Sequence, residues 1–203
     1  MPSPLLTALV ALYNHYEETF ETCKKVGVES PPVFIVVCNN TSTSKLVYEW
    51  VSGWQRSNED GEPVFVQNGH IALFRNFDEH GNRFPKPNTL LIDSQQLESG
   101  EALDKEFRQA AALEIEQFQR ERRQRSGAGE NGDLSDADLL REVMNTVGKK
   151  GRLGEQIRCV VSVSMLTEGW EYEHGHAHPG RSCVWNAVAL RASRWPWSTP
   201  LLL

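Results

Sequence analysis

Three short runs of apolar residues punctuate the chain, and each is followed by a polar turn. They cover residues 33–37, 89–93 and 157–163; the first is apolar at every position, and the other two contain adjacent apolar residues. That pattern is typical of parallel strands buried on both faces. Helical patterns separate the three runs, so the chain predicts an α/β fold in which helices cover a mainly parallel sheet.

Helical spacing marks the segments around these strands. An early proline precedes apolar positions at helical intervals in the first sixteen residues, and the segment behind the first strand shows the same spacing. These positions are Leu5, Leu9, Leu12 and Tyr16, and then Leu46, Val47, Trp50 and Val51. Residues 101–125 form a longer helical stretch. Ser135, with Asp138 three residues later, predicts the N-cap of a helix that runs to about Val147 and closes at Gly148.

The stretch between the first two strands is rich in turn residues. It spans residues 57–88 and contains two short apolar runs, at 64–66 and 71–74. We expect a small hairpin insertion in this part of the chain.

Composition narrows the function classes only slightly. The 203 residues suffice for one sizeable core, and the net charge of −6 argues against a generally basic nucleic-acid coat or a binder of anionic membranes. A local basic patch stays compatible with that charge. The four cysteines form no Cys-x-x-Cys pair, which favours reduced thiols in a cytoplasmic protein. The opening apolar run is too short to span a bilayer and lacks the features of a signal peptide.

Small polar residues follow the first strand. They are Asn39, Asn40, Thr41, Ser42 and Thr43, at the end of a strand where open α/β sheets place their ligands. Their side chains, with the free N–H groups of the next helix, could hold a phosphate. A plain polar turn that caps the helix explains the same residues equally well.

The third strand is followed in the same way. In "SMLTEGW", Ser164 and Thr167 can donate hydrogen bonds to phosphate, Gly169 allows close backbone approach, and Trp170 could close the site by stacking. An ordinary strand-to-helix turn uses similar residues. If the first and third strands are neighbours, both turns lie at the same edge of the sheet, which favours a shared site.

Two other motifs do not support a site. "GKKG" at residues 148–151 lacks the remainder of a Walker A loop, since Val143 and Lys150 stand where that motif needs Gly and Ser or Thr. A basic run comprises Arg120, Arg122, Arg123 and Arg125. It ends a predicted helix, where cations complement the helix dipole, and a solvated helix end is favoured over a DNA contact.

Several stretches resemble the restriction (Res) subunit of type III restriction-modification systems. They are "LLTALVALYNHYEETFE", "PPVFIVVCNNTSTSKLVYEWVSG", "LFRNFDEHGNRFPKPNTLLIDSQQLESGEALDKEFRQAAALEIEQF" and "DLLREVMNTVGKKGRLGEQIRCVVSVSMLTEGW". The resemblance runs almost continuously from about residue 3 to Trp170. It implies an incomplete RecA-like, three-layer lobe, the second lobe of a superfamily 2 helicase motor.

The resemblance also implies roles for the two turns. "VFIVVCNNTSTSK" is similar to motif IV, which makes Asn39, Asn40, Thr41 and Ser42 candidates for contacts to the DNA backbone. "VSMLTEGW" is similar to motif V. It would bring Ser164 and Thr167 to the DNA, and Glu168, Gly169 and Trp170 to the nucleotide cleft. The family continues with Asp after this Trp, where the chain has Glu171.

The intact family enzyme is an ATP-dependent DNA translocase and site-specific endonuclease that uses Mg²⁺. It acts on double-stranded DNA with a modification methyltransferase subunit, in which sequence recognition resides. Walker A, Walker B, motif VI and the nuclease domain have no counterpart in these residues. We therefore expect a truncated Res subunit that binds no cofactor and catalyses nothing on its own. The alternative is a standalone lobe that binds DNA or the modification subunit without turnover.

The resemblance stops at Trp170, where the composition changes to His, Trp and Pro. The family continues approximately "NTVTHILGVRAFGTQLLCEQVVGRGLR". If Glu173 onward is encoded GAA CAC GGT CAC GCA CAT CCT GGG, reading one base later gives Asn-Thr-Val-Thr-His-Ile-Leu-Gly. We therefore expect residues 1–170 to form the lobe and residues 171–203 to be an out-of-frame, poorly packed tail. Sequencing the gene across the Trp170 codon tests whether the reading frame shifts there.

The tail also contains a possible metal-binding pattern. His174, His176 and His178 alternate, so an extended segment would place them on one face, and imidazoles bind Zn²⁺ or Ni²⁺ readily. No carboxylate is placed by a recognisable fold to orient them. We expect no metal site, and keep a His-cluster metalloprotein as the third class of hypothesis.

Overall fold

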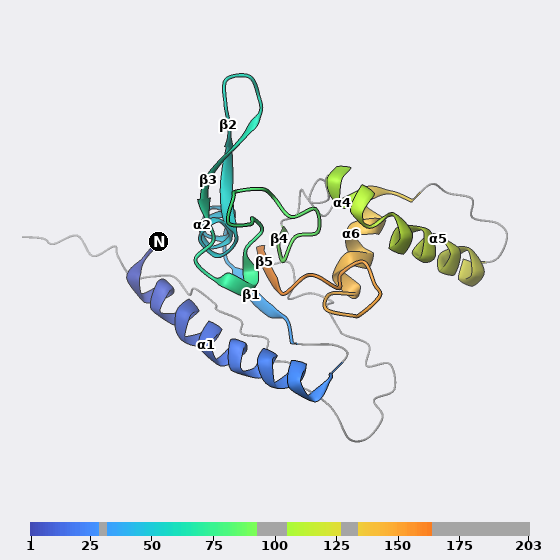
Figure 1. The fold of residues 1–203 in the computed structure, drawn as a ribbon, viewed down its shortest axis with the longest axis horizontal. Coiled ribbons are helices and arrows are strands. Elements are labelled where there is room, and N and C mark those ends of the chain that lie inside the picture. Colours follow the sequence, from blue (N-terminus) through green and yellow to red (C-terminus); the bar gives the residue numbers. More distant parts are fainter. Residues whose placement is uncertain (29–31, 93–104, 127–133, 164–203) are drawn as a thin grey trace, which may run out of the picture.

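The computed structural model describes residues 1–28, 32–92, 105–126 and 134–163 (Figure 1). The helices are α1 (Ser3–Val26), α2 (Thr41–Ser52), α4 (Lys105–Ala110), α5 (Ala112–Ser126) and α6 (Asp136–Asn145), with a 3₁₀ turn, η1 (Ala72–Phe74). The strands are β1 (Phe34–Cys38), β2 (Gly53–Ser57), β3 (Pro63–Asn68), β4 (Thr89–Ile92) and β5 (Cys159–Val163). All three predicted strands are present.

The three predicted strands form one parallel sheet in the order β1-β5-β4. β5 comes last in the sequence and lies in the middle, paired with both of the others. Its first residue, Cys159, is opposite Phe34 of β1 and Thr89 of β4. The α/β class with a parallel sheet is therefore confirmed.

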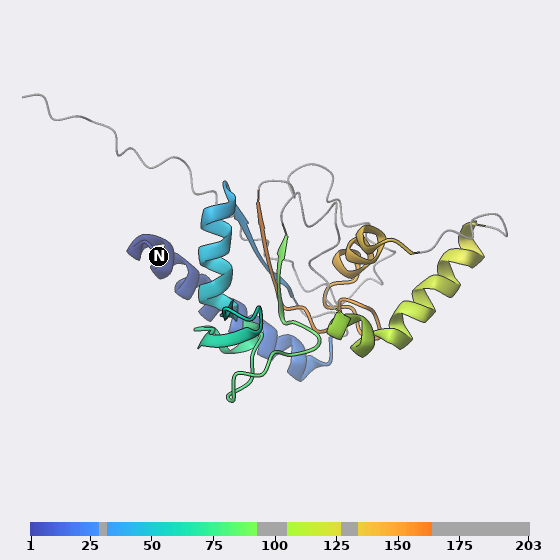
Figure 2. The same ribbon diagram turned by 90° about the horizontal axis from the view of Figure 1, so that it is seen from above.

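Helices cover both faces of this sheet, as Figure 2 shows from above. One face packs against α1, α2 and η1, the other against α4 and α6. Neighbouring residues of a strand divide between the two faces, so Phe34 and Val161 join the first core while Ile35 and Val160 join the second. Burial on both faces explains why adjacent residues of these strands are apolar.

Helix α1 is longer than the pattern of its first sixteen residues indicated. It continues to Val26 and ends at Gly27, whose φ of 72° is in the left-handed region that favours glycine. Tyr16 attaches it to the sheet: the hydroxyl donates to the Pro32 carbonyl at 3.0 Å, and the ring lies 5.6 Å from that of Phe34.

The predicted hairpin is present, but the two apolar runs are not its two strands. In the hairpin, β3 contains the first apolar run and pairs with β2, which begins directly after α2. Since "GWQRS" contains no run of apolar residues, β2 was not predicted as a strand. The second apolar run forms η1 rather than a strand and contributes Phe74 to the core. The helical stretch 101–125 is also corrected within its described part: Ala111 separates α4 from α5.

A buried asparagine connects the loop after the hairpin to the sheet. The Asn76 side chain donates to the Tyr48 hydroxyl at 3.0 Å and to the Thr89 carbonyl at 2.9 Å. Its Oδ1 accepts from the backbone N–H groups of Asn88 and Thr89, both at 2.9 Å. With only 1% of Asn76 exposed, this side chain replaces solvent for the polar groups where β4 begins.

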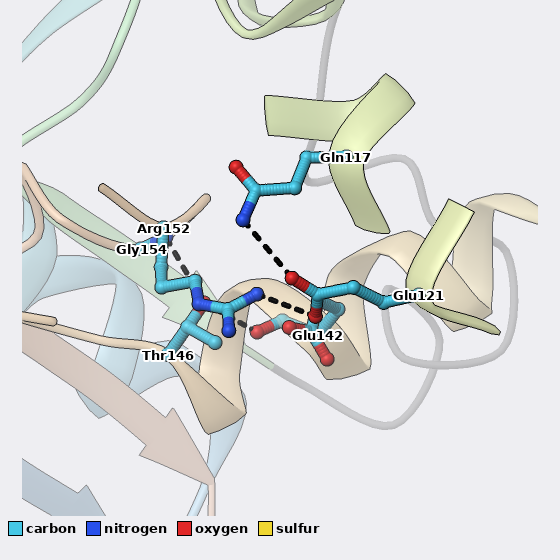
Figure 3. A network of polar contacts seen from close by, with 6 residues as sticks. All are labelled: Gln117, Glu121, Glu142, Thr146, Arg152 and Gly154. Carbon is cyan, nitrogen blue, oxygen red and sulfur yellow. Dashed lines mark hydrogen bonds and ion pairs between the residues drawn. The ribbon is translucent and has the colours of Figure 1, made fainter. Parts of the chain in front are cut away.

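The segment between α6 and β5 is fixed by the contacts in Figure 3. Ser135 caps α6 as predicted, accepting from the Asp138 N–H, and the helix ends at Asn145, two residues before the expected position. Thr146 Oγ1 donates to the Glu142 carbonyl at 2.7 Å and accepts from Gly154 N–H at 3.1 Å. A Cβ on Gly154 would lie 2.4 Å from the Val143 carbonyl oxygen, so the loop packs directly on the helix backbone.

Among the described residues, none of the helices combines the length and apolar character needed to cross a membrane.

Candidate nucleic-acid interface

The turn that follows β1 is exposed at the carboxyl edge of the sheet. Asn40 is the N-cap of α2, and its Oδ1 accepts from the Thr43 N–H at 2.8 Å. Its Nδ2 donates to Asn39 Oδ1 at 3.0 Å. The capping interpretation is thus correct for Asn40, and this side chain is already engaged within the protein.

Thr41 and Ser42 have a different position in the same turn. They are the first two residues of α2 and both are exposed. Backbone N–H groups at the first positions of a helix have no partner within the helix, and the first turn of α2 contains no acidic residue. Two hydroxyls and two N–H groups are therefore available to an anion at the positive end of the helix dipole.

The structure adds Lys45, which the sequence patterns did not single out. It lies one turn after Thr41 on the same side of α2, and its side chain is 69% exposed. Its Nζ is 3.9 Å from Glu49 Oε1, a surface ion pair of the kind that contributes little. The i, i+4 spacing from Thr41 was the signal in the sequence. Lys45 gives this edge a cation beside the hydroxyls.

The second predicted turn begins at the same edge. Cys38, immediately before Asn39, pairs in register with Val163, immediately before Ser164. The structure therefore confirms that the strands preceding the two turns are parallel neighbours and end at the same level. Ser164, Thr167, Glu168, Gly169 and Trp170 themselves lie outside the described residues.

Burial disfavours the thiolate form of the cysteine nearest this edge. Burial raises the pKa of Cys38 to about 11, so the thiol is protonated at neutral pH. Burial likewise raises the pKa of Cys159, which begins the central strand, above its usual range. The described part of the edge thus provides hydrogen-bond donors and a cation, which suit binding of phosphate rather than covalent chemistry.

Two of the four arginines in the basic run form ion pairs within the protein. Arg120 is ion-paired with Glu116 at 2.6 Å, and Arg122 with Asp138 at 3.0 Å. Hydrogen bonds from Ser135 and from Arg122 hold the pKa of the Asp138 carboxyl below its ordinary value. These contacts favour the interpretation of the run as a helix surface.

The "GKKG" loop lies at the other edge of the sheet, before β5 begins. The Gly148 N–H donates to the Gly154 carbonyl at 2.8 Å, and the Lys149 N–H to the Thr146 carbonyl at 2.9 Å. Backbone groups that would cradle a phosphate in a Walker A loop are here used to close a turn.

No described part of the chain brings three His, Cys, Asp or Glu side chains together as a metal site would require. His174, His176 and His178 lie outside the described residues, so the structure does not test the histidine hypothesis. Comparison of the chain with protein-family models, with curated proteins and with solved structures gives no match.

Proposed function

We propose that residues 1–170 are part of the second RecA-like lobe of a type III Res subunit, and that its carboxyl edge contacts the DNA backbone. The observation that carries the proposal is the pairing of Cys38 with Val163, because it brings the strands before "NNTSTSK" and "SMLTEGW" to one edge. In the intact enzyme this edge would serve an ATP-dependent DNA translocase and site-specific endonuclease that acts with a modification subunit.

Thr41, Ser42 and Lys45 would bind the backbone of double-stranded DNA. The two hydroxyls and the first N–H groups of α2 would donate to phosphate oxygens, and Lys45 would release a counterion on binding. Such contacts position a strand without reading its bases, consistent with a system in which another subunit recognises the sequence.

The described residues do not fit ATP with Mg²⁺. They contain no phosphate-binding loop and no metal-ligand cluster, and Glu168, Gly169 and Trp170, the candidates for the nucleotide cleft, are not among them. On its own the chain would hold DNA or the modification subunit without turnover, and the tail after Trp170 would be the product of a shifted frame.

Duplex binding measured by fluorescence anisotropy over a range of salt concentrations tests this proposal. We expect Thr41→Val with Ser42→Ala to weaken binding about tenfold while leaving the salt dependence almost unchanged, because both side chains are neutral. Lys45→Gln should reduce the slope of log K against log salt by about 0.9, the value for one phosphate contact. Asn40 is left intact in these variants so that the helix cap is preserved.

The matched control is Thr22→Val, an exposed threonine on α1 whose hydroxyl bonds only its own helix in the contacts described. It should bind DNA like the parent chain. Absence of duplex binding, or equal losses in the Thr22 and Thr41 variants, would contradict the proposal.

A further inference from the structure

Helix α5 has the least apolar attachment of the described helices. Figure 2 shows it at the end of the molecule, farther from the sheet than α6. None of residues 112–124 is buried, whereas α6 buries four apolar side chains. Ile115 and Phe118 pack against the core only in part, and Leu113 is 80% exposed. Apolar burial alone therefore does little to hold α5 in its position.

Three ion pairs join α5 to the rest of the molecule, each between side chains of two different segments. The pairs are Glu114 with Lys86 at 2.6 Å, Glu121 with Arg152 at 2.7 Å, and Arg122 with Asp138 at 3.0 Å. We call these three pairs the α5 latch. Its partners outside α5 lie in the loop before β4, in the loop after α6 (Figure 3) and in the first turn of α6. The latch therefore fastens both halves of α5.

All six side chains of the latch are partly exposed to water. Their exposed fractions range from 24% to 40%, so salt screens these pairs and each contributes little. Two of the carboxylates also have a second polar neighbour: Asp138 lies 3.8 Å from Arg141, and Glu121 accepts from Gln117 at 3.0 Å. Separation of the pairs therefore leaves each charge in contact with water or with another partner.

The neighbouring helix α4 is attached in a different way. Phe107 is 2% exposed, Ala111 at the junction with α5 is 0% exposed, and both belong to the core that α6 covers. Screening by salt weakens ion pairs but does not remove apolar burial of this kind. Helix α5 can therefore leave while α4 stays in place. A free helix of 15 residues is marginal in water, so the backbone amides of α5 would then lose their protection from exchange.

We propose that α5 is a detachable helix, which the α5 latch holds on the body at low ionic strength and releases, ahead of the rest of the fold, as salt is added. Release exposes Ile115 and Phe118 together with the part of the core against which they pack. The ionic strength thus decides whether this apolar surface is covered. The inference concerns the chain by itself and does not rest on the proposed function.

Hydrogen–deuterium exchange of the full chain, measured by mass spectrometry of its peptides, tests the proposal. Between about 0.1 M and about 1 M potassium chloride the screening length falls from about 10 Å to about 3 Å. We expect the exchange of α5 amides to rise about tenfold over this range, as the combined effect of three weak pairs. The amides of α6 should keep their rate, because buried apolar side chains hold that helix.

Variants of the latch separate its charges from other contacts. Arg152→Glu places a second carboxylate beside Glu121, so it should raise α5 exchange at low salt and reduce the response to added salt. Addition of Glu121→Arg restores the pair with its charges reversed, and exchange should return to the rate of the parent chain. Lys86→Gln breaks a pair in another loop and should raise α5 exchange about threefold, which provides a second test if Arg152→Glu perturbs its own loop.

The matched control is Arg120→Gln. Its ion pair with Glu116, at 2.6 Å, lies within α5 and does not join the helix to the body, so this variant should exchange like the parent chain. Exchange of α5 in step with α6 at both salt concentrations would overturn the proposal, because α5 would then open only with the whole fold. Equal effects of Arg120→Gln and Arg152→Glu would overturn it as well, and so would a reversed pair that fails to restore the parent rate.

Discussion

Replacing Gly154 with alanine is expected to destabilise the protein by about 3 kcal/mol or more. The added Cβ would lie 2.4 Å from the Val143 carbonyl oxygen and 2.6 Å from the Val147 nitrogen. Both are backbone atoms, one in the last turn of α6 and one just after it, and they cannot rotate away, so the loop and the helix must separate. That separation would also break the hydrogen bond from the Gly154 N–H to Thr146 Oγ1. Urea unfolding followed by circular dichroism measures the loss.

Gly151 in the same loop provides the matched control. Its φ is 72°, which alanine adopts at some cost, but no atom lies within 4 Å of the position of a Cβ. Gly151→Ala should therefore cost about 1 kcal/mol, from backbone conformation alone. Equal losses for the two substitutions would show that close packing of Gly154 on α6 is not what requires glycine.

Replacing Asn76 with alanine is expected to cost about 3 kcal/mol. The change leaves the N–H groups of Asn88 and Thr89 without the Oδ1 that accepts from both, and it removes the donor to the Thr89 carbonyl. Asn76→Asp should not restore stability, because a carboxylate cannot donate to that carbonyl and would carry a buried charge.

The control for Asn76 is Asn145→Ala, an exposed asparagine at the end of α6. Its effect should stay within about 0.5 kcal/mol. Chemical unfolding of all three variants gives the comparison. If Asn76→Ala lowers the free energy of unfolding as little as Asn145→Ala does, then water or a shifted loop hydrogen-bonds the polar groups at the start of β4 in its place.

The main elements could be predicted because their patterns have direct physical causes. Burial on both faces makes adjacent residues of β1, β4 and β5 apolar, and the hydroxyl of Ser135 satisfies an N–H that the first turn of α6 leaves open. β2 could not be predicted in this way. It is half of an exposed hairpin, so no core requires apolar residues in "GWQRS".

The candidate site was predictable in place but not in detail. Strand ends and small polar residues indicated the turn after β1, yet the same composition serves a cap and a phosphate site. Only the geometry shows that Asn40 caps α2 while Thr41 and Ser42 stay exposed. The hydrogen bonds of Asn76 could not be predicted from the sequence. Its partners Tyr48 and Thr89 are distant in sequence and contact it only in the folded chain.

The order of the sheet has a consequence for how the chain acquires its structure. β1 and β4 do not pair with each other, and both form their hydrogen bonds with β5. Phe34 in β1 therefore cannot pair until Cys159 in β5 has been synthesised. During synthesis the first two strands remain without their hydrogen-bonding partner until the central strand has left the ribosome. Contacts so distant in sequence make folding slow and leave apolar strands exposed to aggregation in the meantime. A chaperone that binds nascent chains would have the synthesis of all the residues between Cys38 and Cys159 in which to act.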